Sequence, residues 1–438
     1  MTTDNNVQMD AKHSGSPDGL GTTPLATAFW SRHLRSYMGP LLEKCGSYTP
    51  EEQASHLDFM DKHIAPCLGP MPSEPHGPYT APSSLYGSPI DASLNFTSTG
   101  KPKLRFDFDF LTPIHRMGPD PFGEKTAREL LRRVAATVGA NTQWMEHLMD
   151  KFWLSPAETE VALSKIPAEM AIPPAMIGIE MDGPKISMKA YIPAMRKAIA
   201  TGRSSTDIIL EAVRAMDPFG PEFEYGLDIL EDYIANSGAT KTLVLAGVDC
   251  VDPTVNKDAR IKCYMHTVDT TFGVAKDMMT LGGRLNDEIS LQRVETLRQM
   301  WPLLLNEPDG SSISDTWSKP ERFSGTGYAG RVYTAEIRPG NQLPMTKVYV
   351  PVFQYADSSD VTEKNYEGVL KIIDNSWGHT QKYSEFMQSV FGRGAYGQTY
   401  FTYSSSEKKG SYTTTYFAKP INNQGVGGEK EMDQFVYV

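Results

Sequence analysis

Three short segments of the chain repeat one chemical pattern, a cation two residues before a tyrosine. They are Lys189-Ala-Tyr191, Lys262-Cys-Tyr264 and Lys347-Val-Tyr349. Each segment reads as a β-strand, and because side chains alternate across a strand, its cation and its tyrosine fall on one face. If these faces turn inward, they make a poor hydrophobic core but a suitable binding site for a polyanion attached to an apolar group.

Two larger sets of residues extend this pattern. The candidate anion-binding cations are Arg105, Lys189, Arg260, Lys262 and Lys347, and the tyrosines expected beside them are Tyr191, Tyr264, Tyr349, Tyr412 and Tyr416. Buried like charges raise one another's cost, so the cations are expected to need a bound anion to compensate them. Phenol rings attract a desolvated cation by roughly 0.5–2 kcal/mol each. A site that binds a diphosphate beside a carbocation would account for both sets, the cations through the diphosphate and the tyrosines through the carbocation.

The cations recur at a regular spacing that indicates an internal repeat. The steps from Arg105 to Lys189, from Lys189 to Lys262 and from Lys262 to Lys347 are 84, 73 and 85 residues. Each period contains two helical patterns and then two strand patterns, as in the predicted helices Met195–Met216 and Tyr225–Asn236. Five such units predict ten antiparallel strands, closed into an α/β barrel with helices outside and a solvent-filled chamber inside.

Composition narrows the class of protein. The 438 residues carry a net charge of -11, which opposes nucleic acid or an anionic membrane as the main partner. The four cysteines form no Cys-x-x-Cys pair, and no histidine cluster or Asp-Asp-x-x-Asp segment occurs, so neither a metal site nor a disulfide framework is indicated. We expect a reduced, cytoplasmic protein with a disordered leader at 1–23, one barrel domain at 24–420 and a tail at 421–438. The leader has no apolar run long enough for a signal peptide or a membrane span.

Several motifs together resemble the fungal aromatic (indole) prenyltransferases of the dimethylallyltryptophan synthase family. In chain order they are Gly87-Ser-Pro-Ile-Asp-Ala-Ser-Leu-Asn95, Arg105, the three cation-tyrosine segments with Arg260, Glu336-Ile-Arg-Pro-Gly340, and Tyr412 with Tyr416. The resemblance covers nearly the whole chain after the leader. It implies the ABBA fold of five helix-helix-strand-strand repeats, dimethylallyl diphosphate as co-substrate, and no obligatory metal or other cofactor.

The resemblance also implies roles for the candidate residues. The five cations would hold the diphosphate, with Lys189 counted as catalytic, and the five tyrosines would shield the allylic cation. Asp91 would be the second catalytic residue, because its carboxylate stands where the family accepts a hydrogen bond from the indole N–H of the acceptor. The family usually has glutamate at this position. The base that removes the ring proton is left open between Glu180 and the departing diphosphate.

Two departures from the family bear on the acceptor. Members that act on free tryptophan have a lysine shortly before the Lys-x-Tyr strand, where this chain has Met176, and an arginine ahead of the segment Asp249-Cys-Val-Asp252, where it has Leu243-Val-Leu245. We therefore favour a polycyclic indole such as an indole diterpene. A phenolic or xanthone-type acceptor is the alternative within the enzyme class, and a non-catalytic barrel that binds an amphipathic anion is the alternative outside it. A homodimer is left open.

Overall fold

The computed structural model describes residues 22–70, 79–80, 88–99, 101–109, 112–113, 118–167, 170, 172–237, 241–307, 309–310, 313–323, 329–340, 342–356, 358–392 and 397–419. The tail predicted at 421–438 lies outside this part of the chain, as does the predicted leader except for Thr22 and Thr23.

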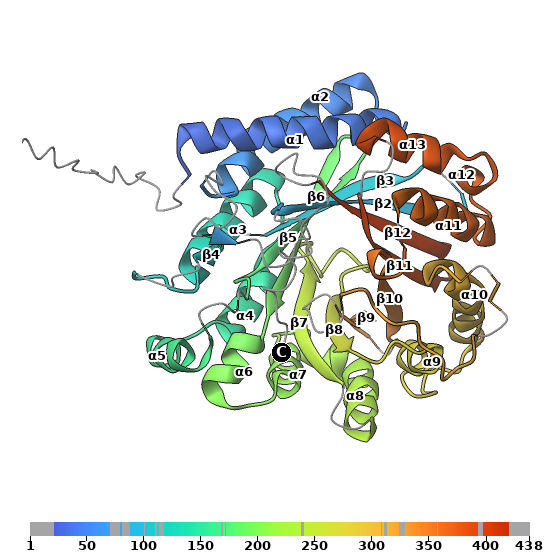
Figure 1. Ribbon diagram of the computed structural model, residues 1–438. Coiled ribbons are helices and arrows are strands. Elements are labelled where there is room, and N and C mark those ends of the chain that lie inside the picture. The colour runs from blue at the N-terminus through green and yellow to red at the C-terminus, as the bar shows by residue number, and fades with distance from the viewer. Residues whose placement is uncertain are drawn as a thin grey trace, which may run out of the picture.

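Ten strands form a closed antiparallel barrel in the order β10-β11-β12-β2-β3-β5-β6-β7-β8-β9 (Figure 1). Their bounds are β2 Ile90–Thr97, β3 Lys103–Asp109, β5 Met176–Asp182, β6 Lys185–Pro193, β7 Thr242–Asp249, β8 Ile261–Thr267, β9 Arg331–Ile337, β10 Met345–Pro351, β11 Gln398–Ser406 and β12 Gly410–Ala418. A separate two-residue pair joins β1 Tyr79–Thr80 to β4 Thr112–Pro113. The predicted ten-stranded barrel is confirmed.

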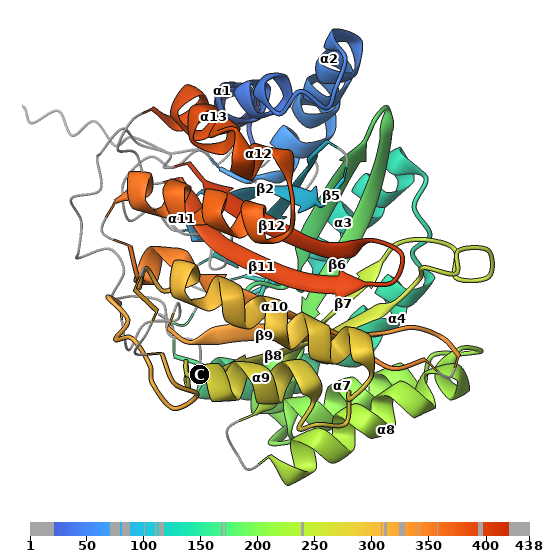
Figure 2. The same cartoon turned by 90° about the vertical axis from the view of Figure 1, so that its right-hand side faces the viewer.

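The helices form a shell around the barrel, as the two views at right angles show (Figures 1 and 2). Their bounds are α1 Pro24–Lys44, α2 Pro50–Phe59, α3 Glu124–Val138, α4 Gln143–Phe152, α5 Pro156–Lys165, α6 Met195–Thr201, α7 Ser205–Arg214, α8 Gly220–Asn236, α9 Phe272–Thr280, α10 Glu288–Leu304, α11 Ser359–Ile372, α12 Ser376–His379 and α13 Lys382–Phe391. Each of the five units therefore has its helices before its two strands, as the repeat predicts.

Local sequence explains where the helices begin. Thr23 caps α1 by accepting a hydrogen bond from the backbone N–H of Ala26, and a proline follows at the first helical position. Thr49 with Glu52, and Ser155 with Glu158, form reciprocal capping boxes at α2 and α5. These caps satisfy backbone donors that have no partner inside the helix.

The strands separate an apolar outer face from a polar inner face. On β2, Ala92, Leu94 and Phe96 are completely buried beneath the helices, whereas Asp91 and Ser93 alternate with them and face the interior. Pairing of β12 with β2 closes the barrel, with Tyr416 opposite Ser93 and Ala418 opposite Asp91. Closure leaves no strand edge and fixes which inward side chains become neighbours.

Some predicted boundaries are wrong. The single helix predicted at Met195–Met216 is two helices, because Gly202 takes a left-handed conformation with φ 71° and Ser204 caps the start of α7. Helix α5 was not predicted, and α8 begins at Gly220 instead of Tyr225. These differences change the helical shell and leave the order of the strands as predicted.

Candidate active site

Five alternate strands, β3, β6, β8, β10 and β12, run in the same direction around the barrel and each presents two successive inward positions. The first positions hold Arg105, Lys189, Lys262, Lys347 and Thr414, and the second hold Asp107, Tyr191, Tyr264, Tyr349 and Tyr416. We call the four cations of the first set, with Arg260, the cation level, and the four tyrosines of the second set the tyrosine level. Along a strand the two levels are separated by two residues, or about 6.6 Å.

The tyrosine level is a continuous row of rings. Ring centroids are 5.9 Å apart between Tyr191 and Tyr264, 6.0 Å between Tyr264 and Tyr349, and 6.2 Å between Tyr349 and Tyr416. Burial raises the pKa of each phenol, so the rings remain neutral and their faces stay available to a cation. The structure thus brings four of the five predicted tyrosines together.

The fifth, Tyr412, lies among the cations. Its ring centroid is 5.4 Å from Nζ of Lys347 and 5.7 Å from Nζ of Lys409. Tyr412 is four residues before Tyr416 on β12, so the two phenols share an inward face but stand at different depths. Tyr412 is therefore separate from the row of the other four rings, and its part in the shield stays a prediction.

The cation level is already paired with three carboxylates. Glu180 binds Lys189 at 2.5 Å and Arg105 at 3.1 Å. Asp249 binds Lys262 at 2.8 Å and Arg260 at 3.0 Å. Glu336, whose side chain is completely buried, binds Arg260 at 2.7 Å and Lys347 at 3.2 Å. The five predicted cations therefore form one connected network.

This network corrects the expectation that the cations depend on a bound anion for compensation. Most of their charge is neutralised by protein carboxylates, because Lys262 lies opposite Glu336 on β9 and Lys189 lies opposite Asp249 on β7. Five cations against three carboxylates still leave an excess of two formal positive charges. This excess favours a bound polyanion, and the paired carboxylates hold the cations in place.

Two lysines of this region have pKa values near the physiological range. Burial, opposed by Asp249 and reinforced by the charges of Arg260 and Lys189, lowers the pKa of Lys262 to about 8. Burial and then the charges of Arg105 and Arg260 lower the pKa of Lys409 to about 8. Lys409 lies in the turn between β11 and β12. An arriving diphosphate would favour the charged form of both lysines.

Asp91 lies on β2 with its side chain in the interior, directly opposite Asp107 on β3. Burial raises its pKa well above the usual range, and the charges of Asp107 and Asp109 raise it further. Among the described residues, no donor reaches its buried Oδ1 atom. A carboxyl group in this state can still accept a hydrogen bond from an N–H through its carbonyl oxygen.

Glu180 is a poor candidate for the base. Burial alone would raise its pKa, but the charges of Lys189 and Arg105 outweigh burial and hold the pKa far below the usual range. A carboxylate with so little affinity for a proton cannot take one from a substrate near neutral pH. Of the two alternatives left open by the sequence, the ion pairs of Glu180 with Lys189 and Arg105 disfavour this one.

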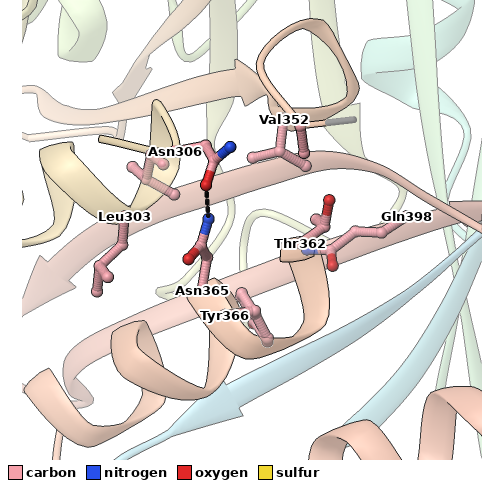
Figure 3. Close-up of a pocket in the computed structure, with 9 residues that line it drawn as sticks. Leu303, Asn306, Val352, Thr362, Asn365, Tyr366 and Gln398 are labelled. Carbon is pink, nitrogen blue, oxygen red and sulfur yellow. Dashed lines mark hydrogen bonds between the residues drawn. The ribbon is translucent and has the colours of Figure 1, made fainter. Parts of the chain in front are cut away.

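A small hollow in the helical shell is separate from this interior (Figure 3). It lies beside α10, α11 and the start of β11, and the residues that line it include Leu303 and Tyr366. Asn365 donates a hydrogen bond of 3.2 Å to Asn306 across it, and the hydroxyl groups of Tyr366 and Thr413 lie 2.9 Å apart. The hollow contains no member of the cation or tyrosine level.

Neither a cluster of metal ligands nor a membrane-spanning helix occurs among the described residues. In these ranges, no group of three or more His, Cys, Asp or Glu side chains is arranged to hold a metal ion. None of the described helices combines the length and the apolar character needed to cross a membrane.

Comparison with known proteins identifies the family. The model of the family described as tryptophan dimethylallyltransferase matches residues 26–385. The chain belongs to this family. An indole prenyltransferase of Emericella nidulans, tdiB, is 52% identical over 409 residues, which cover 92% of this chain and 98% of the relative. An indole diterpene prenyltransferase of Tolypocladium album, terF, is 30% identical over 438 residues, with 95% and 99% covered. The chain is thus a prenyltransferase, as the motifs imply.

Solved structures agree with the barrel. NotF, in a complex with brevianamide F and DMSPP, superposes with a TM-score of 0.74 at 23% identity, covering 93% of this chain and 97% of NotF. AnaPT from Neosartorya fischeri gives a TM-score of 0.73 at 20% identity, covering 91% and 95%. The prenyltransferase barrel implied by the motifs is confirmed.

The structure adds residues to which the sequence gave no role. Asp249 and Glu336 stood in quoted motifs, but their neighbours on other strands were unknown, and Lys409 was not singled out. Asp107 lies two residues after Arg105, at the spacing that joins Lys189 to Tyr191. That spacing was the signal that could have found it.

Proposed function

We propose that this prenyltransferase transfers a dimethylallyl group from dimethylallyl diphosphate to an aromatic carbon of an indole acceptor. The observation that carries the proposal is the arrangement of the cation level and the tyrosine level on the same strands. The cation level suits a diphosphate. The tyrosine level, about 6.6 Å further along the strands, suits the short allylic chain attached to the diphosphate. A relative at 52% identity that is named an indole prenyltransferase supports the choice of acceptor.

In the proposed reaction, the allylic C–O bond ionises and the diphosphate leaves with the bonding electrons. Arg105, Lys189, Arg260, Lys262 and Lys347 stabilise the leaving group, and because carboxylates already fix their positions, little reorganisation is needed. Tyr191, Tyr264, Tyr349 and Tyr416 enclose the allylic cation and exclude water, which would otherwise capture it. Tyr412 contacts the diphosphate side of the site. The electron-rich ring then attacks the cation in a Friedel-Crafts alkylation.

Asp91 is the proposed contact to the acceptor. Its inward carboxyl group has an oxygen that no described residue satisfies, and an indole N–H supplies the missing donor. We favour a polycyclic indole of the indole diterpene type, since relatives so named align along nearly the whole chain. A homodimer and a cytoplasmic location remain predictions from the sequence.

The test is to incubate the protein with dimethylallyl diphosphate and a panel of indoles and phenols in the presence of EDTA, and to detect prenylated products by mass spectrometry. We expect prenylation of polycyclic indoles. Lys189→Met should remove most of the activity, whereas Lys103→Met should retain it. Lys103 is a matched control because it lies on β3 but forms an exposed ion pair with Asp182.

The panel also separates the alternatives. Prenylation of phenols in preference to every indole would overturn the choice of acceptor. Tight binding of dimethylallyl diphosphate without any transfer or hydrolysis would favour the non-catalytic barrel.

A further inference from the structure

Asp107 occupies a position that the other repeats give to tyrosine. On β6, β8, β10 and β12 the inward residue of the second position is a tyrosine, and on β3 it is Asp107. In the barrel order, β3 lies midway between β12 and β6, which carry the two ends of the tyrosine row. Asp107 therefore fills the gap in the tyrosine level between Tyr416 and Tyr191.

Gly178 provides room for this carboxylate. It is the partner of Asp107 on β5, and a Cβ atom placed there would lie 2.5 Å from Oδ1 of Asp107 and 3.1 Å from the ring of Tyr191. Burial raises the pKa of Tyr191 and of Tyr416, and the charge of Asp107 raises each further. Asp107 thus lies beside both rings, in the space where the allylic cation would form.

Asp107 differs from the carboxylates of the cation level in its hydrogen bonding. Glu180, Asp249 and Glu336 each bind two cations directly. No described residue donates a hydrogen bond to Asp107, whose side chain is half-buried and open to the interior. Its lone pairs are consequently available to a substrate.

Resting on the proposed function, we propose that Asp107 is the catalytic base that removes the proton from the prenylated ring. When the ring carbon attacks the cation, it forms a C–C bond and becomes a positively charged arenium centre that still bears its hydrogen. The Asp107 carboxylate accepts this proton, and the electrons of the broken C–H bond restore aromaticity. The diphosphate has already left with the electrons of the C–O bond, and the Asp107 carboxyl group releases its proton to water when the products leave.

The affinity of Asp107 for a proton suits this role. Burial, opposed by Lys189, Lys262 and Arg105, raises its pKa to about 6. At neutral pH the group is therefore ionised in most molecules, yet it accepts a proton much more readily than the carboxylates of the cation level. Burial also raises the pKa of the opposite carboxyl group, Asp91, and the charge of Asp107 raises it further.

Charged and titratable groups face Asp107 from several strands. They are Asp91 on β2, Arg105 and Asp109 on β3, Glu180 on β5, Lys189 and Tyr191 on β6, Lys262 on β8, Tyr349 on β10 and Tyr416 on β12. Of the facing carboxyl groups, Glu180 has a pKa well below that of Asp107, and burial raises the pKa of Asp91 well above its usual range. An acidic limb of activity with a midpoint near pH 6 that disappears in Asp107→Asn would therefore report Asp107.

The test compares Asp107→Asn with wild type, using an indole acceptor deuterated at the carbon that is alkylated. We expect the variant to lose about 100- to 10,000-fold in prenylation, the range that general-base catalysis supplies. A primary isotope effect should appear, because proton removal becomes rate-limiting, and the acidic limb near pH 6 should disappear. Ionisation of the donor, measured as dimethylallyl alcohol formation, should continue, since the cation level is intact.

Asp182→Asn is the control, because it removes an exposed carboxyl group that pairs with Lys103 and should retain the wild-type rate and the acidic limb. Asp107→Ala is a second variant in case the asparagine variant unfolds. Added formate should restore part of its prenylation, because formate supplies a carboxylate in place of the missing side chain. The proposal is overturned if a folded Asp107 variant keeps the wild-type rate and acidic limb. It is also overturned if donor ionisation and prenylation fall equally with no isotope effect. A wild-type protein that prenylates no acceptor would instead contradict the proposed function.

Discussion

Replacing Lys262 by methionine tests the role of the cation level most directly. The substitution removes the ammonium group and keeps a side chain of similar length. The Lys262 side chain is only 6% exposed, and its Nζ lies 2.8 Å from Asp249 and 5.7 Å from the ring of Tyr191. It is thus a member of the cation level whose ammonium group also lies close to the tyrosine level.

The expected loss follows from this position. A preorganised donor to developing negative charge contributes about 2.7–4 kcal/mol, so kcat should fall roughly 100- to 1,000-fold. The fold should survive, because Asp249 keeps its bond to Arg260 at 3.0 Å and is not left as an unpaired buried charge. Lys103→Met, which removes an exposed lysine from the same barrel, should leave kcat unchanged.

The pH dependence gives a second measurement of the same residue. The pKa of Lys262 is lowered to about 8, so its charge is present below this value and is lost as the pH rises through it. In wild type, kcat/KM for dimethylallyl diphosphate should therefore fall above pH 8. At saturating donor the fall in kcat should move to higher pH, because bound diphosphate favours the charged lysine.

Lys409 also has a pKa lowered to about 8, so the profile must be measured in Lys262→Met, Lys409→Met and the double variant. Each single variant should lose one part of the alkaline fall, and the double variant should lose all of it. The reasoning is refuted if Lys262→Met stays within about threefold of wild type, or if the double variant retains the alkaline fall unchanged.

Three further predictions concern the metal, the tyrosine level and Asp91. Turnover should persist in EDTA, since protein cations neutralise the diphosphate; complete loss that magnesium reverses would contradict this. Gly247→Ala should displace Tyr191, whose ring atom lies 2.6 Å from the added Cβ, and should raise the ratio of dimethylallyl alcohol to prenylated product measured by chromatography; an unchanged ratio would count against the shield. Asp91→Asn should raise the melting temperature more at pH 8 than at pH 4.5. The pKa of Asp91 is higher in the fold than its ordinary value of 3.8, so wild type loses stability as the pH rises, and the neutral amide does not. An equal change in melting temperature at both pH values would argue against a raised pKa of Asp91.

Much of the architecture could be predicted from local sequence. The alternation of Lys189 with Tyr191, and of Lys347 with Tyr349, is a property of a few adjacent residues, and a strand places such pairs on one face wherever it lies. Repetition of two helical and two strand patterns then favours a closed barrel, because closure satisfies every strand edge. Helix ends were predicted less well, since a break such as that at Gly202 depends on a single residue inside an otherwise helical pattern.

The partners of the site residues were decided by the tertiary structure. Closure of the barrel pairs β12 with β2, and the register of each strand pair sets Glu336 opposite Lys262 and Asp91 opposite Asp107. These contacts join residues far apart in the chain, so no local pattern reveals that the cations are already paired.

The same limit applies to the chemistry of individual groups. The sequence by itself determined which residue types line the interior and in what order along each strand. Whether a carboxyl group is held by two cations, like Glu180, or lies unbonded beside a tyrosine ring, like Asp107, depends on burial and on neighbours from other strands. Burial and these neighbouring charges exist only once the barrel is closed. Proton affinity depends on both, because it responds to the surrounding charges and to the loss of water.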